Sequence, residues 1–214
     1  MIAFPSLSIE EGDRLLASVC RSSLKVFVNH FWPMVPGTQT LKWNWHLDVL
    51  CAELQQVGER VFQGLPKLHD VIFNVSPGTS KSSLASILFP AWVWTRMPHA
   101  RVMTASHTSD LVLDLANKSR HVIKSAEYRR LYPEIVIRPD NDSKGYYANT
   151  LGGDRYTCTV AGKSPMGFHA HFQLCLPYES CIITSMGHLP IGEVVEKKLP
   201  VKVLAYNHVT DSVR

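Results

Sequence analysis

The segment from Ser76 to Ser82, Ser-Pro-Gly-Thr-Ser-Lys-Ser, has residue types that bind phosphate. It follows the apolar run Asp70–Val75 and precedes apolar residues at helical spacing, so the sequence predicts a strand, a turn and the start of a helix. At such a turn, backbone N–H groups and the positive end of the helix dipole attract phosphate oxygens. In this interpretation Lys81 contacts the outer phosphates and the Ser82 hydroxyl ligates Mg²⁺.

The loop departs from the pattern G-x-x-x-x-G-K-[ST] at both glycine positions. Val75 and Ser80 occupy these positions, and Gly78 is the single glycine between them. An ordinary strand, turn and helix with a solvated Lys81 is therefore the alternative interpretation. A second match, the Gly-Lys-Ser at 162–164, is followed by proline where a helix should begin, so we do not interpret it as a nucleotide loop.

The elements around this loop predict an α/β domain with a mostly parallel sheet. Prolines punctuate residues 1–40, so we expect an irregular arm there, with a helix near Glu10–Val19. The further predicted elements are, in chain order, a helix from Trp45 that ends at Gly64–Pro66, the strand Asp70–Val75, a helix opened by Lys81 and Ser82, a strand Arg101–Ala105, a helix Asp110–Lys124 with Leu111, Leu115, Val122 and Ile123 on one face, a hairpin of Tyr146–Thr150 and Arg155–Val160, and a strand Ala170–Leu174.

Length and composition exclude several classes of protein. The chain has 214 residues, of which 45% are hydrophobic, enough for one domain with a core. The longest apolar run is interrupted by Pro90, so no membrane span is predicted. The net charge of +4 lies wholly in residues 1–174 and is too small to indicate nucleic-acid binding by itself. The five scattered cysteines indicate a reducing, cytosolic setting; they are Cys20, Cys51, Cys158, Cys175 and Cys181.

Read as an ordered set, six segments within residues 41–174 resemble the ATPase domain of large terminase subunits, the DNA-packaging motors of tailed phages. The segments are Trp45-His46 before a helix, NVSPGTSKS at 74–82, FPAW at 89–92, MTASH at 103–107, KSRHVI at 118–123 and the stretch from Asn149 to His171. This family tolerates glycine-poor phosphate loops that contain proline. The resemblance implies a P-loop NTPase-type fold with ATP and Mg²⁺ as cofactors.

The resemblance also implies roles for individual residues. Lys81 and Ser82 would hold phosphate and Mg²⁺, with Gly78, Thr79 and Ser80 as the cradle. The pair Trp45 and His46 falls at the adenine side of the nucleotide, although a buried aromatic at a helix start is an equal alternative.

Four further residues have two interpretations each. Thr104 and Ser106 fall where the family couples hydrolysis to movement, but strand-end hydroxyls also cap helices. Arg120 and Arg155 are candidates for contacting the γ-phosphate, but surface or structural arginines are the more common case.

The expected metal-binding acids are missing. The strand that ends at Leu174 should run into one carboxylate that holds Mg²⁺ and another that polarises water. Here it runs into Cys175, and Glu179 lies beyond a proline. We therefore expect an interrupted nucleotide site, and the severed central strand should leave a sheet edge exposed.

The segment from 175 to 208 resembles the beginning of an intein, closest to the split inteins of replicative polymerase subunits. It shares the initial Cys175, the turn at Gly187 and the Leu-Pro-Ile-Gly at 189–192. The resemblance implies the β-rich (Hint-type) fold of self-splicing domains. A Cys175 thiolate would attack the carbonyl of Leu174 and form a thioester at this scissile bond. A buried free cysteine is the alternative for Cys175, and Cys181 is expected in core packing.

The later intein elements do not occur in the chain, and Asn207–Thr210 predicts a hairpin turn. The expected organisation is an arm at 1–40, a partial terminase ATPase domain at 41–174 and an N-terminal intein fragment at 175–214. Splicing would need the remaining intein and terminase. These would be supplied by a complementary chain if the gene is naturally split, or by further sequence if the sequence is truncated. The joined product would meet the small terminase subunit, the portal and double-stranded DNA in the cytoplasm of an infected bacterium. The alternatives are a non-splicing P-loop NTPase fragment and an inactive gene remnant.

Overall fold

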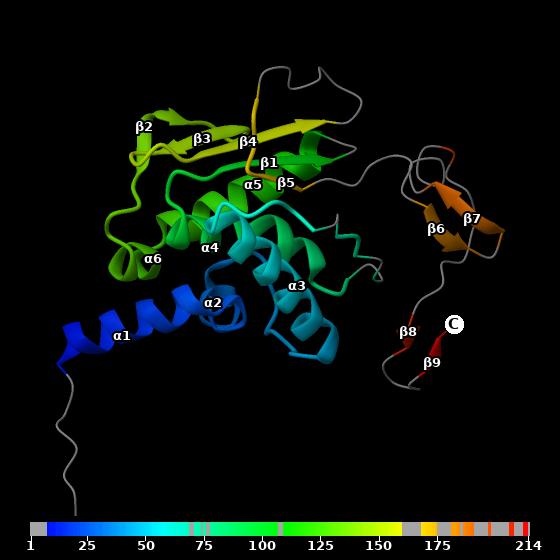
Figure 1. The fold of residues 1–214 in the computed structure, drawn as a ribbon, viewed down its shortest axis with the longest axis horizontal. Coiled ribbons are helices and arrows are strands. Elements are labelled where there is room, and N and C mark those ends of the chain that lie inside the picture. The colour runs from blue at the N-terminus through cyan, green and yellow to red at the C-terminus, as the bar shows by residue number, and fades with distance from the viewer. Residues whose placement is uncertain are drawn as a thin grey trace, which may run out of the picture.

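The computed structural model describes residues 8–68, 71–73, 75, 78–106, 109–159, 168–174, 181–184, 186–190, 197, 206–207 and 212–213. The main body is a mixed α/β structure in which an open five-stranded sheet packs against helices (Figure 1). The predicted α/β class is therefore confirmed.

The sheet is mixed rather than mostly parallel. Its strands are β1 (Arg101–Ser106), β2 (Ile137–Asp142), β3 (Tyr146–Asn149), β4 (Asp154–Thr159) and β5 (Phe172–Leu174), in the order β2-β3-β4-β1-β5. The pairs β4–β1 and β1–β5 are parallel, whereas β2–β3 and β3–β4 are antiparallel. Among the described residues β5 is an edge strand, whereas the sequence predicted a central strand before Cys175.

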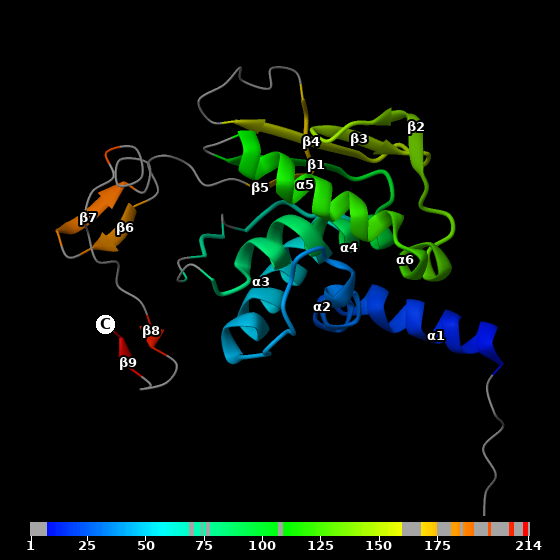
Figure 2. The same ribbon diagram turned by 180° about the vertical axis from the view of Figure 1, so that it is seen from behind.

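The helices gather on one side of the sheet, as both ribbon views show (Figures 1 and 2). They include α3 (Trp45–Phe62), the π-helix η2 (Ser83–Leu88), α4 (Phe89–Arg96), α5 (Ser109–Lys124) and α6 (Ala126–Leu131). The helix α5 contacts β1, β4 and η2. Its buried face carries Val112 in place of the predicted Leu111, which is 49% exposed.

The predicted strand at 70–75 is wrong for the residues that the structure describes, since 71–73 and 75 have no strand pairing. A strand inside a parallel sheet is covered on both faces. Here Phe73 packs on the core, but Ile72 is 77% exposed, so the apolar run is buried on one side only.

The predicted irregular arm is also wrong for residues 8–34. The expected helix near Glu10–Val19 is present as α1 (Ile9–Ser22), but α2 (Leu24–Phe31) and the 3₁₀-helix η1 (Trp32–Met34) follow it. Ser8 forms a capping box with Glu11, and Ser23 caps α2. The residues of α2 that face the core are fully buried, namely Leu24, Phe27, Val28 and Phe31. Packing of this apolar helix, rather than local propensity, orders the segment.

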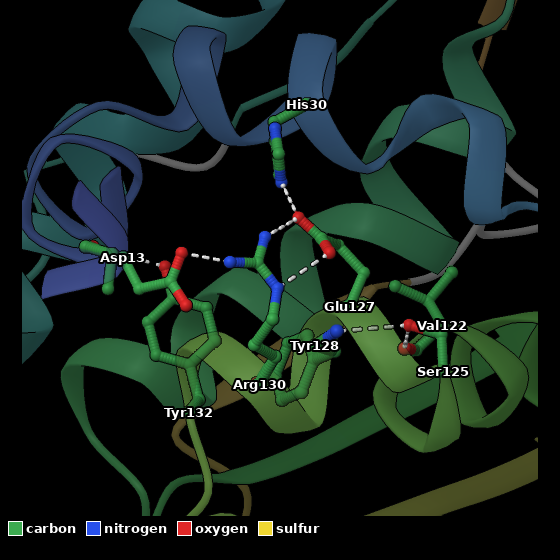
Figure 3. A network of polar contacts seen from close by, with 9 residues as sticks. Asp13, His30, Val122, Ser125, Glu127, Tyr128, Arg130 and Tyr132 are labelled. Carbon is green, nitrogen blue, oxygen red and sulfur yellow. Dashed lines mark hydrogen bonds and ion pairs between the residues drawn. The ribbon is translucent and has the colours of Figure 1, made fainter. Parts of the chain in front are cut away.

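An ion-pair network joins these first helices to α6 (Figure 3). The Nε2 of His30 lies 2.7 Å from a carboxylate oxygen of Glu127, which also accepts a hydrogen bond of 2.6 Å from Arg130. Arg130 in turn pairs with Asp13 of α1. The N-terminal helices are therefore tied to a helix about a hundred residues later in the chain.

The predicted hairpin of β3 and β4 is confirmed, and its turn depends on Gly153. A Cβ at this position would lie 2.2 Å from the carbonyl oxygen of Pro98, so only glycine fits. The side chain of Asn149 accepts hydrogen bonds of 2.9 Å from the backbone N–H groups of Leu151 and Gly153. These contacts fix the hairpin against the end of α4.

Beyond the five-stranded sheet, the described residues form two small antiparallel pairs. The strands β6 (Cys181–Thr184) and β7 (Gly187–Pro190) form a hairpin, and Gly187 has the positive φ of 100° that its turn requires. The strands β8 (Tyr206–Asn207) and β9 (Ser212–Val213) pair across the predicted turn. Cys175 and the Gly-Lys-Ser at 162–164 lie outside the described residues.

Candidate functional site

The segment 78–83 and two neighbouring segments some thirty residues earlier in the chain line one pocket of about 740 Å³, a volume typical of small-molecule sites. The predicted phosphate loop forms one wall with residues 78–83. The start of α3 contributes His46 and Leu47, and the stretch Thr38–Lys42 with Trp32 closes the remaining side. The pocket therefore brings the predicted loop together with one of the two predicted adenine-side residues.

The loop turns sharply at two residues of positive φ. Gly78 has a φ of 81°, which costs glycine little, and Ser80 has a φ of 64°. Ser80 occupies a position where the phosphate-loop pattern has glycine, so serine adopts here the conformation that glycine favours. Such strain in a non-glycine residue is often stored at functional sites.

Helical backbone begins at Lys81 and continues without a break to Arg96. The N–H of Leu84 donates to the carbonyl of Ser80 at 3.0 Å, which closes the first turn. The first turn of a helix presents N–H groups and a partial positive charge. Since residues 81–83 line the pocket, this end of the helix faces the space where a ligand would bind.

Two side chains, one from the loop and one from α3, hold the loop by hydrogen bonds to its carbonyl groups. The ammonium group of Lys81 donates to the carbonyl of Val75 at 2.9 Å, so it folds back over the loop. Burial lowers the pKa of Lys81. The Nε2 of His46 donates to the carbonyl of Thr79 at 3.2 Å and ties the loop to α3. The loop thus holds its shape through α3 and its own lysine.

The charge of the pocket suits an anion. Its described lining contains the cations Lys42 and Lys81 and the titratable His46, and no Asp or Glu is among those lining residues. The exposed hydroxyl of Ser82 offers one oxygen ligand to a cation that arrives with the anion. Over the described residues, no group of three or more His, Cys, Asp or Glu side chains is placed to hold a metal by itself.

Comparison with protein-family models, with curated proteins and with solved structures finds no significant match for this chain. In the described part of the chain, no helix is both long and apolar enough to cross a membrane.

The two predicted adenine-side residues differ in their surroundings. His46 lines the pocket, whereas Trp45 is absent from the described lining and is 53% exposed. The alternative of a buried aromatic at the helix start is wrong for Trp45 for the same reason. The two rings meet edge to face with centroids 6.3 Å apart, so Trp45 backs the His46 ring.

The two candidate arginines occupy structural positions. Arg120 of α5 bonds to the side chains of Asp142 and Asn117. Arg155 of β4 is buried, and donates to the hydroxyl of Thr104 and to the carbonyl of Ser86. These contacts favour the structural interpretation of both arginines, and they give Thr104 a partner inside the sheet. Ser106 is buried at the end of β1.

The stretch Thr38–Lys42 forms one wall of the pocket and was not predicted from the sequence. The indole N–H of Trp32 donates to the carbonyl of Gln39 at 2.8 Å, and the hydroxyl of Thr38 donates to the carbonyl of Val35 at the same distance. These bonds fold the stretch back over η1. Two hydroxyl residues and a lysine just before a predicted helix were the available signal.

The predicted scissile bond lies after the last residue of β5. Leu174 pairs with Thr104 of β1 and packs against the core. Its partner Cys175 is outside the described residues, so the role of this cysteine stays a prediction.

Proposed function

We propose that the pocket binds the phosphates of a nucleoside triphosphate, with ATP as the expected ligand. The observation that supports this most is the convergence of the strained loop at 78–83, a helix start and two lysines on one cavity without a described carboxylate. Phosphate binds where backbone N–H groups, a helix dipole and cations meet. A solvated lysine on an ordinary turn does not account for the cavity or for the contact of His46 with the loop.

In the proposed complex each group of the loop has a task. Backbone N–H groups at Thr79 and Ser80 face the phosphate oxygens, and Lys81 leaves the carbonyl of Val75 to contact the outer phosphates. The Ser82 hydroxyl is an oxygen ligand for Mg²⁺, which neutralises phosphate charge when it is bound. Lys42 on the opposite wall adds a second positive charge.

Equilibrium binding of a fluorescent ATP analogue with Mg²⁺ tests this proposal on the full chain. We expect saturable binding that Lys81→Met weakens by about tenfold or more, because a hydrogen bond to a charged group is lost. The matched control is Lys118→Met, since Lys118 pairs with Asp114 on the surface of α5. Equal affinity in the wild type and in Lys81→Met would contradict a phosphate site at this loop.

The wider proposal concerns the whole chain. We propose that residues 41–174 are the nucleotide-binding part of a phage DNA-packaging ATPase, and that 175–214 begin an intein that interrupts it before its metal-binding acids. Support comes from the six ordered segments, from the intein-like run after Leu174 and from the absence of a carboxylate in the described pocket lining. Splicing with a complementary chain would then restore the acids and the ATPase.

A strong thiol tests the splicing step directly. If Cys175 forms a thioester with Leu174, incubation with a thiol releases a fragment that ends at Leu174, and mass spectrometry identifies it. Cys175→Ala should abolish the release, while Cys158→Ala should not change it. Without cleavage in the wild type and without a ligated product in the presence of the complementary chain, the second candidate function, a non-splicing P-loop NTPase fragment, takes the place of the intein proposal.

A further inference from the structure

The helix behind the phosphate-binding loop is locally a π-helix. Within η2 the N–H of Phe89 bonds to the carbonyl of Leu84, five residues earlier, where an α-helix bonds four residues earlier. The sequence gives a reason for this, because Pro90 lacks an N–H and its ring clashes with the carbonyl of Ser86 in an α-helix. Segments of π-helix are rare and frequently mark functional sites.

Two side chains from other elements bond to carbonyls of this π segment. Arg155 of β4 donates through Nη2 to the carbonyl of Ser86 at 3.0 Å and through Nη1 to the hydroxyl of Thr104 on β1. Ser119 of α5 donates to the carbonyl of Ile87 at 2.8 Å. The segment behind the loop is thus fastened to both the sheet and α5.

The environment of Arg155 is costly for a cation. The residue is 1% exposed, and in the described part of the chain no carboxylate forms an ion pair with it. The guanidinium donates to the carbonyl of Ser86 and to the hydroxyl of Thr104, and its buried Nε has no hydrogen-bond partner among the described residues. The free energy needed to take a cation out of water without a carboxylate partner exceeds the free energy gained from hydrogen bonds to neutral groups. An apolar side chain of similar size at this position would therefore make the fold more stable.

We propose that Arg155 is a positioning residue for the phosphate-binding loop. Its hydrogen bonds join the carbonyl of Ser86 to Thr104 and hold η2 in its π register. The register of η2 in turn fixes the direction in which the side chains of Lys81 and Ser82 point from the first turn of the helix. A change of one residue in register would turn the preceding residues by about 100° around the helix axis. This inference rests on the proposed nucleotide site, whose loop it positions.

Affinity for the fluorescent ATP analogue with Mg²⁺, measured on the full chain, tests the inference. We expect Arg155→Met to bind at least about tenfold more weakly, because the charged hydrogen bonds are lost, and Arg155→Lys to recover part of the loss. The matched control is Arg120→Met, which removes a partly buried arginine that bonds to Asp142 and Asn117 and not to η2. It should bind within about twofold of the wild type at a temperature where each variant is folded. Equal weakening in Arg155→Met and Arg120→Met would overturn the inference.

Hydrogen exchange without ligand separates this inference from the proposed function. We expect faster exchange of the amides at 84–88 in Arg155→Met and unchanged exchange there in Arg120→Met. Thr104→Val removes the anchor of Arg155 while keeping its charge, and replaces Arg155→Met if that variant does not fold. If the wild type binds no nucleotide, the proposed function fails, and unchanged exchange at 84–88 in Arg155→Met or its replacement overturns the inference regardless of nucleotide.

Discussion

The strain at Ser80 gives the sharpest quantitative prediction. A left-handed backbone costs an L-residue about 1–2 kcal/mol, and Ser80 has a φ of 64°. Ser80→Gly removes that cost but adds about 0.4–1 kcal/mol of unfolded-chain entropy. The net result is a rise of about 0.5–1 kcal/mol in the free energy of unfolding, or about 1–4 °C in the melting temperature of a chain of this size.

Thermal unfolding of Ser80→Gly and Ser83→Gly, followed side by side, measures this effect. Ser83 lies three residues later inside helical backbone, where glycine is less favourable than serine by about 0.5 kcal/mol. The same substitution should therefore raise the melting temperature at one position and lower it at the other. A fall in both variants would refute the assignment of strain to Ser80.

Three further predictions concern an ion pair, a turn and the pocket wall. The hydrogen bond from Arg130, and after it the one from His30, lower the pKa of Glu127 from its usual 4.5. The stabilisation of the fold by ionised Glu127 is therefore present above pH 4.5 and is lost as the pH falls through the lower pKa of the folded state. Glu127→Gln should cost about 1–2 kcal/mol at neutral pH and flatten the acid side of a curve of melting temperature against pH. Gly153→Ala should lower the free energy of unfolding by about 2 kcal/mol or more because its Cβ has no room, whereas Gly12→Ala on open helix surface should raise it by about 1 kcal/mol, both measured by urea unfolding. Lys42→Ala should weaken binding of the ATP analogue roughly two- to fivefold at low salt and less at high salt, as an exposed charge does.

Local periodicity was sufficient to predict the elements whose burial is one-sided. The apolar steps after Trp45 gave α3, and the short run predicted as a strand at 101–105 is β1, which extends to Ser106. The hairpin of β3 and β4 followed from its Gly-Gly turn. In each case the sequence pattern and the packing in the fold agree.

The elements α2 and β2 were missed. The buried residues of α2 recur at helical spacing, namely Leu24, Phe27, Val28 and Phe31, and Lys25 and Asn29 are exposed on the other face, so the amphipathic period was present in the sequence and was overlooked. The strand β2 has the polar sequence Ile-Arg-Pro-Asp-Asn-Asp and lies at a sheet edge, where a proline is tolerated. Prolines near α2 had suggested irregular chain, and no element had been predicted over β2.

The candidate site was predicted in part. The residues 78–82 and His46 do line one pocket, because local chemistry and spacing determine a loop before a helix. The wall formed by Thr38–Lys42 depends on the indole of Trp32, a contact that no local pattern reveals. The strain at Ser80 follows from the path of the loop, which the residue type alone would not have suggested.

The fastening of the N-terminal helices to distant partners has a consequence for synthesis on the ribosome. The hydroxyl of Tyr132 donates to the carbonyl of Ala17 across 115 residues, and Arg130 reaches Asp13 across 117. At translation speeds of about 5–20 residues per second, α1 and α2 wait roughly 6–25 seconds for these partners. During that interval the rings of Phe27 and Phe31 on α2 lack the rings of Tyr128 and Tyr132 against which they pack in the folded chain, so this part of the core closes only after α6 has been made.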